Sequence, residues 1–274
     1  MQWGIVKTRI FRHLILLSVF GVVQAEAREL EIDAGNSARS NSIVTFTCPK
    51  IQERGILESA DKKISVFYQQ QPDGNVTFVM PSMAAGEKTT LRQGSYSGTI
   101  RDYAIAKQEG DEIQLRAENK KTSSYQSQVV AVYQTASRKS PRPNLDPKFL
   151  RGGYLHPLIT PSGKIVTDDY AVNHLHHHGV WTAWTKTAYD GREPDFWNMG
   201  QGKGKVDFAS LDKTWSGPVE AGLVSKQKFT DLTNGSPIDI LDETWTVKTY
   251  FTAGTYNLID LESVQKIIGD KPLE

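Results

Sequence analysis

The sequence predicts an all-β protein, built as a large antiparallel β-sandwich with a smaller β-sandwich portion on its N-terminal side. Apolar residues in the first half recur with a period of two, as they do on a half-buried strand. No ten-residue segment before Ser140 carries the apolar stripe of a helix. In the second half, longer alternating stretches are bounded by clusters of Gly, Asn, Pro or Asp. Because these stretches exceed the usual strand of about five or six residues, they favour a large curved sandwich over a compact barrel.

The composition is that of a packed globular protein. Of the 274 residues, 38% are hydrophobic and 23% are charged, close to the average for folded domains. Lys and Arg number 32 against 31 for Asp and Glu, a formal net charge of +1. A chain with no basic excess lacks the broad positive surface that binds nucleic acid, so we expect no nucleic-acid partner.

The first 27 residues have the pattern of a signal peptide. A basic start with Lys7, Arg9 and Arg12 precedes the apolar run Leu14–Val23, and small residues suited to cleavage follow. The run is shorter than the roughly 20 residues that span a bilayer, so we expect no integral membrane domain in the mature chain. The sequence therefore predicts a periplasmic or secreted protein. Its one cysteine, Cys48, can form no intramolecular disulfide, and we expect it to be a buried thiol.

Several strands are predicted before the middle of the chain. The turn at residues 72–75, Pro-Asp-Gly-Asn, predicts a hairpin because Pro presets φ and Gly or Asn accepts a positive φ. The expected strands are Ile43–Cys48, Lys63–Tyr68, Val76–Met80, Thr99–Ala104, Glu112–Ala117 and Ser127–Tyr133.

A polar, basic stretch with two prolines, residues 137–144, reads as an exposed connection. We place a boundary there, between an N-terminal portion at residues 28–140 and a second domain at residues 141–274. The pattern leaves open whether it separates two domains or two layers of one sandwich. The strands expected beyond it are Gly204–Leu211, Val219–Phe229, Thr244–Thr252 and Asn257–Val264.

The segment from His174 to Asn198 concentrates the chemistry of the chain. It holds four of the six histidines and three of the six tryptophans. Imidazole moves protons and binds metals near neutral pH, so four of them within five residues predict a site. On a strand, His174, His176 and His178 would share one face and His177 would point to the other, with the apolar residues 180–184 continuing the strand into the core. A solvated tract without a role is the simpler alternative.

The same spacing of His174 and His176 suits a pair of metal ligands, so a divalent metal is an open alternative. A third ligand would have to come from His156, Asp168, Asp169 or Glu193 by folding back. The segment does not match the H-E-x-x-H pattern of zinc proteases, and we predict no defined metal site.

Other residues would complete a site for a polar organic ligand. Asp169 and Asp195 are placed to orient an imidazole or to act as a base, and Glu243 is a more distant candidate for catalysis. Arg151 could bind an anionic group. Trp197 and Trp181 could hold the apolar face of a sugar ring, although tryptophans such as Trp181 and Trp184 commonly fill sandwich cores.

The chain resembles a family of bacterial exported proteins that carry the label "methane oxygenase PmoA". The resemblance covers about residues 151–264 and rests on five blocks, Tyr154–Leu158, Thr160–Lys164, Val166–Tyr170, His174–Trp181 and Asp195–Trp197. It implies a large β-sandwich similar to the galactose mutarotase supersandwich, with a His as acid and a Glu as base at a sugar ring. It also implies that the chain is truncated at its C-terminal end. Asn173 and His178 depart from the family pattern, which has an acidic residue and a fixed cation there.

The sequence thus predicts an exported carbohydrate-associated protein that performs acid/base chemistry on a saccharide or sugar derivative at a His-rich groove. The alternatives are a metal-dependent enzyme of jelly-roll type and a non-catalytic sugar-binding module. The expected partner is a small molecule or an oligosaccharide. The expected catalytic residues are His156, His174, His176, His177, Asp169 and Glu243, and the expected substrate-binding residues are Arg151, Asp195, Trp197 and Trp181.

Overall fold

The computed structural model describes residues 7–8, 29–71, 74–121, 124–136, 144–252 and 256–274. Apart from Lys7 and Thr8, the predicted signal peptide lies outside the described residues. The protein is all-β, as the periodicity predicts, and its strands form several antiparallel sheets. No helix among the described residues is long and apolar enough to cross a membrane. The chain divides into two compact units, unit 1 at Met1–Arg101 and unit 2 at Asp102–Glu274.

Unit 1 is one seven-stranded antiparallel sheet with the order β1-β2-β7-β4-β5-β6-β3. β5 and β6 pair through Tyr68 and Phe78, as the predicted hairpin requires, and residues 72 and 73 of its turn lie outside the described residues. The expected strands at residues 43–48, 63–68 and 76–80 all fall on observed ones. The strands of unit 1 are β1 (Lys7–Thr8), β2 (Glu29–Asp33), β3 (Arg39–Thr47), β4 (Arg54–Ser59), β5 (Ser65–Gln70), β6 (Asn75–Met83) and β7 (Lys88–Gln93).

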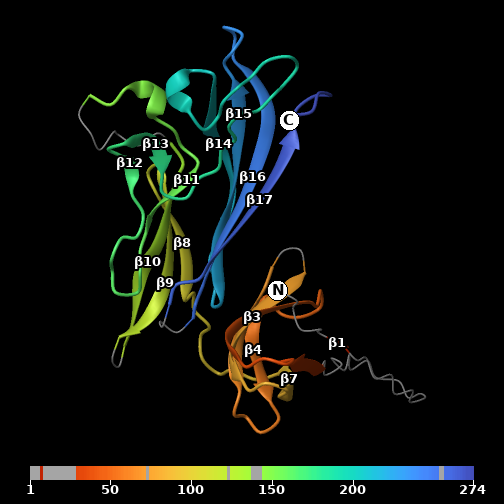
Figure 1. Ribbon diagram of the computed structural model, residues 1–274. Coiled ribbons are helices and arrows are strands. Elements are labelled where there is room, and N and C mark those ends of the chain that lie inside the picture. The colour runs from red at the N-terminus through yellow and green to blue at the C-terminus, as the bar shows by residue number, and fades with distance from the viewer. Residues whose placement is uncertain (1–6, 9–28, 72–73, 122–123, 137–143, 253–255) are drawn as a thin grey trace. The chain divides into compact units, whose positions relative to one another are not determined.

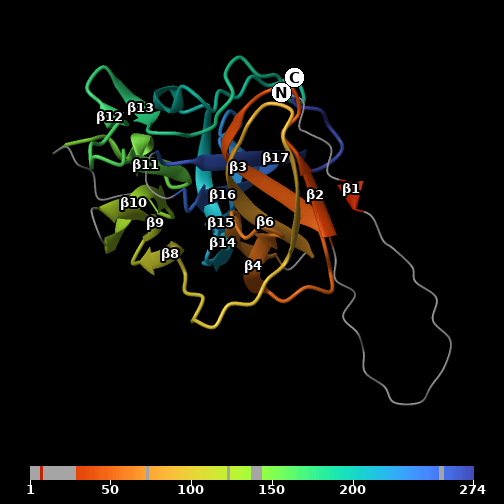
Figure 2. The ribbon, with the colours of Figure 1, turned by 90° about the horizontal axis from the view of Figure 1, so that it is seen from below.

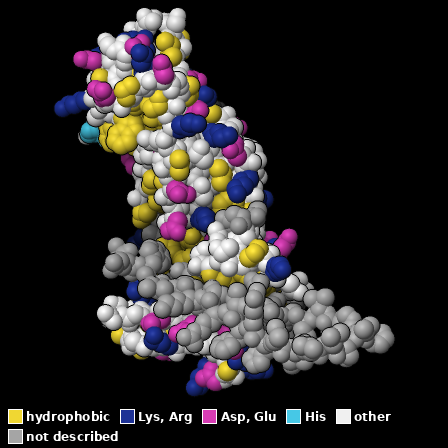
Figure 3. Space-filling view, turned by 90° about the vertical axis from the view of Figure 1, so that its right-hand side faces the viewer, with side chains coloured by type: hydrophobic (Ala, Val, Ile, Leu, Met, Phe, Trp, Pro, Cys, Tyr) yellow, Lys and Arg dark blue, Asp and Glu magenta, His cyan; other side chains and the backbone are white. Residues whose placement is uncertain are grey.

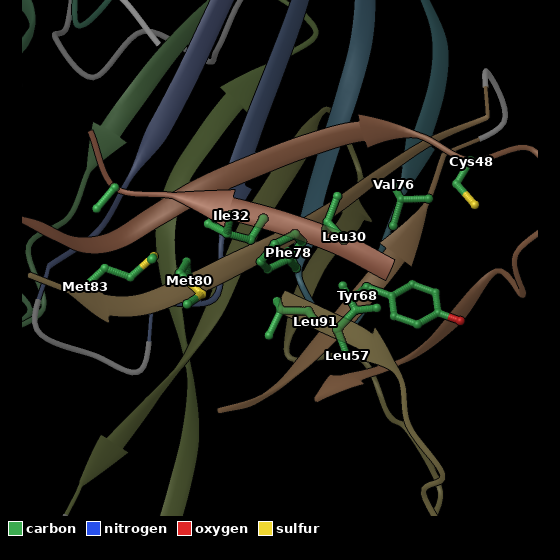
Figure 4. Packing of buried hydrophobic residues seen from close by; sticks show 11 residues of the cluster. Leu30, Ile32, Cys48, Leu57, Tyr68, Val76, Phe78, Met80, Met83 and Leu91 are labelled. Carbon is green, nitrogen blue, oxygen red and sulfur yellow. The ribbon is translucent and has the colours of Figure 1, made fainter. Parts of the chain in front are cut away.

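Unit 1 packs around an apolar core of its own (Figure 4). Tyr68, Phe78 and Leu91 have no exposed surface, and each such side chain contributes roughly 1.5–3 kcal/mol on burial. Gly55 makes room for the ring of Tyr68, because a Cβ at position 55 would lie 2.6 Å from the tyrosine hydroxyl. Cys48 is a buried thiol outside any disulfide among the described residues, as predicted.

Unit 2 holds two four-stranded antiparallel sheets, with the orders β11-β10-β9-β8 and β14-β15-β16-β17. Figure 2 shows these as separate groups of strands within unit 2. The strands predicted beyond residue 200 are all present. Three of them extend past their predicted ends, whereas the one predicted at Thr244–Thr252 begins earlier, at Ile238, and ends at Tyr250. The strands of the two sheets are β8 (Ala104–Glu109), β9 (Glu112–Lys121), β10 (Ser124–Gln134), β11 (Tyr154–Leu158), β14 (Gly204–Trp215), β15 (Glu220–Asp231), β16 (Ile238–Tyr250) and β17 (Ile259–Ile267).

The boundary predicted at Ser140 does not coincide with the division of the chain. β10 and β11 are neighbours in one sheet, where Tyr133 pairs with Leu155, so the proline-containing connection joins two strands of unit 2. The division falls at Arg101, about forty residues earlier. A strand predicted at residues 99–104 is also misplaced, since β8 begins at Ala104. Polar, proline-rich composition marks an exposed connection, but it cannot tell a linker between units from a loop within one.

The core of unit 2 joins its two sheets. Ile113, Leu115 and Tyr133 from the first sheet belong to one buried cluster with Leu223 and Trp245 from the second. A further cluster near the candidate site includes Phe196, Val206, Phe229 and Ile240. The unit is therefore a β-sandwich, and its core fixes the strands that carry the site.

A small hairpin and two short 3₁₀ helices complete unit 2. The hairpin pairs β12 (Asp169–Ala171) with β13 (His174–His178), and the helices are η1 (Pro147–Phe149) and η2 (Met199–Gln201). The prediction that the histidine strand continues through residues 180–184 is wrong. Gly179 has φ +37°, and a Cβ there would lie 2.1 Å from the carbonyl oxygen of Leu155. The chain turns at this glycine, makes one bridge at Val180 and continues as a loop.

Candidate functional site

Trp181 lies at the centre of the candidate site in unit 2. Its ring centroid is 4.6 Å from that of Trp197 and 5.6 Å from that of His177, and His177 and Trp197 are also 5.6 Å apart. The guanidinium carbon of Arg151 lies 5.5 Å from the Trp181 ring, a cation–π distance. His178 meets Trp181 edge to face at 6.1 Å. We call these five residues the Trp181 cluster.

Four separate segments build this cluster. Arg151 stands just before β11, and His177 and His178 end β13. Trp181 opens the loop after Gly179, and Trp197 lies in the turn before η2. The sequence places three of these segments within 25 residues of one another, while Arg151 joins them through the sheet.

Three of the histidines gather in a way that strand alternation does not predict. The rings of His174 and His177 stack at 4.8 Å, those of His176 and His177 meet at 4.5 Å, and those of His174 and His176 lie 6.0 Å apart. His178 is instead fully buried. The expected grouping of His174, His176 and His178 against His177 is therefore wrong.

The reason is the irregularity of the hairpin. Pairing between β12 and β13 shifts register between Asp169 and Ala171, and Tyr170 adopts a left-handed φ of 52°. Regular alternation needs an unbroken ladder, and an irregular pair of strands redirects its side chains.

The pKa values of His176 and His177 lie below the ordinary value for histidine. Burial is the main cause for both, and the neighbouring imidazoles add to it, whereas Asp195 acts in the opposite direction on His176. Both rings are therefore mainly neutral at pH 7. The Nε2 atom of His177 is buried and has no hydrogen-bond partner among the described residues.

Asp169 serves His178 rather than the other three imidazoles. Its Oδ1 lies 2.9 Å from Nδ1 of His178, and its Oδ2 accepts a hydrogen bond of 3.0 Å from the hydroxyl of Tyr154. Burial lowers the pKa of His178 and outweighs the opposite effect of Asp169. Since the carboxylate accepts, Nδ1 carries the proton, and the buried Nε2 has an unshared pair with no partner among the described residues.

Arg151 is a fully buried cation held by neutral acceptors. Its guanidinium donates to the carbonyl oxygens of Gly152, Gly153 and Thr182 and to Oε1 of Gln227, at 3.1–3.4 Å. Burial lowers its pKa, against the attraction of the more distant carboxylates Asp207 and Glu243, and the group remains charged. Arg151 is therefore enclosed within unit 2 and does not lie at its surface.

Glu243 lies on β16 and is completely buried. Its Oε2 accepts a hydrogen bond of 2.6 Å from Thr182, and its Oε1 accepts from Ser263 at 2.5 Å and from Gln265 at 2.9 Å. These three bonds occupy both oxygens. In this arrangement the carboxylate supports the loop that carries Trp181 and does not face a ligand, unlike the catalytic role expected from the sequence.

Asp195 organises its own turn. It accepts hydrogen bonds from the backbone of Trp197 and Asn198 and from the side chains of Thr185 and Asn198. Burial raises the pKa of Asp195, but these hydrogen bonds together lower it below the ordinary value. Asp195 therefore fixes the backbone of Trp197 in place.

His156 lies on β11, and its Nδ1 is 2.9 Å from the hydroxyl of Thr167. The same hydroxyl accepts a hydrogen bond of 3.0 Å from the backbone nitrogen of Leu158. For the metal alternative, the described residues contain no group of three or more His, Cys, Asp or Glu side chains arranged to hold an ion.

Sequence reasoning missed three contributors to the site. His178 is the buried partner of Asp169, Thr182 joins Arg151 to Glu243, and Trp184 is half-exposed rather than in the core. Neither the hydrogen bond of Thr182 nor the exposure of Trp184 has a local sequence signal. The sequence did predict that Asp169 orients an imidazole, but it did not identify His178 as the partner.

The fold and the site together define a β-sandwich protein with an aromatic and imidazole cluster at one end of its second unit. Residues 113–274 match the model of a family of unknown function, DUF6807. The match covers more than half of the chain and includes every residue of the Trp181 cluster, and the chain belongs to this family. No curated protein and no solved structure matches the chain.

Proposed function

We propose that this protein is an exported carbohydrate-associated protein that binds a saccharide or sugar derivative at the Trp181 cluster and accepts a proton from it at His177. The observation that carries the proposal is the unpartnered Nε2 of His177, which lies on a ring in contact with both Trp181 and the half-exposed Trp197. Because this atom is buried, a ligand hydroxyl reaches it when a neighbouring ring shifts, and the hydroxyl then supplies the missing hydrogen-bond partner.

The chemistry of a sugar fits both kinds of side chain. The C–H face of a pyranose ring is apolar and packs on an indole, while its hydroxyls need donors and acceptors at the edge. Trp197 offers an accessible indole, with 37% of its surface exposed. His174 and His176, next to His177, offer further ring nitrogens. A purely apolar ligand would leave these nitrogens without partners, which is costly.

The lowered pKa of His177 favours a base over an acid. In the proposed step the O–H bond of a sugar hydroxyl breaks, an N–H bond forms at Nε2, and negative charge develops on the sugar oxygen. The buried charge of Arg151, 5.5 Å from the Trp181 ring, contributes a positive potential that favours this charge. A neutral imidazole is the form that accepts a proton, and it predominates at pH 7.

We also propose that the protein is related to the proteins labelled "methane oxygenase PmoA" and that unit 2 has a fold similar to the galactose mutarotase supersandwich. The two facing antiparallel sheets of unit 2 support it. The resemblance implies a Glu as the base, but the buried Glu243 already accepts three hydrogen bonds and supports the loop. We therefore assign the base to an imidazole.

The test is binding and turnover on a glycan panel. Thermal unfolding of the wild type should shift upward with a binding sugar, and His177→Ala and Trp197→Ala should each abolish the shift. Tyr96→Ala removes an aromatic side chain of similar exposure from unit 1 and should keep it. No shift of the wild type with any member would contradict sugar binding. Binding without conversion, followed by NMR of the sugar, would contradict the proton-transfer step and favour a binding module.

A further inference from the structure

We propose that Trp184 forms a second aromatic platform beside Trp197, so that the site takes an oligosaccharide instead of a single sugar unit. This inference rests on the proposed function and specifies its substrate class. Trp184 is 51% exposed, compared with 37% for Trp197.

Trp184 is held by a chain of hydrogen bonds that ends in the core. Its Nε1–H donates to Oε1 of Gln265 at 2.9 Å, and Nε2 of Gln265 donates to Oε1 of Glu243 at 2.9 Å. Glu243 has no exposed surface. Through Gln265, the buried carboxylate of Glu243 thus fixes the orientation of the Trp184 indole. Much of the indole surface nevertheless faces solvent.

The same carboxylate fixes the other end of the loop. Thr182 donates to Oε2 of Glu243, and the carbonyl oxygen of Thr182 accepts from Arg151, which lies over the ring of Trp181. The loop from Trp181 to Trp184 is therefore anchored at both ends before a ligand arrives. Preorganisation of this kind lowers the entropy lost on binding.

Trp184 and Trp197 lie on adjacent segments. The carbonyl oxygen of Trp184 accepts hydrogen bonds from the backbone nitrogens of Phe196 at 2.9 Å and of Trp197 at 3.0 Å. The side chains of Thr185 and Asn198 hydrogen-bond to each other and to Asp195 beside them. Two accessible indoles thus accompany a group of neutral and acidic polar side chains.

This combination favours a glycan over a protein partner. Successive sugar units present apolar faces for the indoles and hydroxyls for the amide, hydroxyl and imidazole groups between and beside them. Towards the upper end of unit 2 in Figure 3, a histidine at the surface lies beside a group of hydrophobic side chains.

The test is a series of neutral oligosaccharides of one to six units from each class bound in the glycan panel, measured by isothermal titration calorimetry. The wild-type affinity should rise about tenfold from the monosaccharide to the longer members, as expected when one more aromatic contact forms. Trp184→Ala should bring this ratio close to one, and Trp184→Phe should retain part of it. Tyr96→Ala, the matched control, should keep the full ratio.

A second variant guards against a folding defect. Gln265→Leu leaves the indole in place but removes the hydrogen bond that orients it. It also removes one donor to the buried Glu243, so the unfolding temperature should fall. The ratio should fall as well, while binding of the monosaccharide is kept and shows that the variant is folded. A ratio that is the same in Trp184→Ala and the wild type, or that is already one in the wild type, overturns the second platform. In either case loss of binding in His177→Ala would still uphold the proposed function, whereas no sugar binding at all would contradict that function itself.

Discussion

The carboxylate of Asp169 accepts a hydrogen bond from the imidazole of His178 at 2.9 Å, with the two side chains 4% and 0% exposed. The pair joins the two strands of the small hairpin, since Asp169 and His178 are also partners in its ladder. Tyr154 adds a second bond to the same carboxylate from β11. The hairpin that presents His174, His176 and His177 is therefore tied to the sandwich from inside.

Replacing this carboxylate should weaken the fold of unit 2. Asp169→Asn keeps the shape but removes the charge that strengthens both hydrogen bonds, and we expect a loss of about 1.5–3 kcal/mol in the free energy of unfolding. Urea denaturation measures the loss. Asp270→Asn, at an exposed position, should change stability by less than about 0.5 kcal/mol. Equal stability of the two variants would show that the pair does not anchor the hairpin.

The stability of unit 2 should fall as the pH decreases below about 6.5. The pKa of His178 is lower in the folded state than its ordinary value of 6.5, so the unfolded chain binds the proton first. The contribution of His178 is complete above pH 6.5 and is lost as the pH falls toward the folded pKa, by up to about 1.4 kcal/mol per pH unit. Denaturation at pH 7.5, 6.5 and 5.5 measures it.

The matched variant for this pH dependence is His178→Gln, which can still donate to Asp169 but does not titrate. Burial raises the pKa of Glu220, so that carboxyl group has the opposite effect on stability, and only the difference between wild type and variant isolates the histidine. His174→Ala, at an exposed position, should keep the wild-type slope. A variant His178→Gln with an unchanged slope would disprove the assignment.

Arg151 should not tolerate lysine. The planar guanidinium donates to four acceptors in different directions. The ammonium group of the shorter lysine side chain cannot form all four of these hydrogen bonds. We expect Arg151→Lys to lower the free energy of unfolding by about 3 kcal/mol or more, because a charge would be buried with too few partners. Arg92→Lys changes an exposed ion pair with Glu29 and should cost less than about 1 kcal/mol. Similar losses in both variants would contradict the buried network.

Glu243→Gln should release the tryptophan loop. The amide cannot accept all three hydrogen bonds that the carboxylate accepts, so Thr182 or Gln265 must lose a partner. We expect faster hydrogen exchange at the indole N–H of Trp184, whose NMR signal is assigned by its absence in Trp184→Phe. A weaker preference for long oligosaccharides should accompany it. Loss of turnover with unchanged exchange would instead identify Glu243 as a catalytic residue.

His176→Ala should remove the sugar-dependent rise in unfolding temperature. His176 contacts His177 at 4.5 Å and contributes a neutral ring nitrogen to the proposed site. Differential scanning calorimetry with and without a sugar that binds the wild type measures the effect. Thr167→Val, which removes the hydroxyl bound to His156, provides a control away from the three grouped imidazoles. A full shift in His176→Ala would count against the site.

Periodicity predicted the strands well because it depends on local alternation. Val76, Phe78 and Met80 alternate along β6 and are all buried, and the long stretches after residue 200 are the strands of the second sheet. The same reasoning failed at the histidines, where Gly179 and the left-handed Tyr170 break the ladder. It also failed at the boundary near Ser140, because the composition of a loop does not reveal which strands it joins.

The sequence by itself determined that the chain is all-β, that its single cysteine forms no intramolecular disulfide, and that imidazoles and indoles gather near one segment. These follow from residue type, spacing and count. Only the tertiary structure decided that His178 belongs with Asp169, that Glu243 supports a loop, and that Trp184 faces solvent while Trp181 lies against Arg151. Such differences depend on burial and on partners brought together from β11, β16 and β17, which no short stretch of sequence contains.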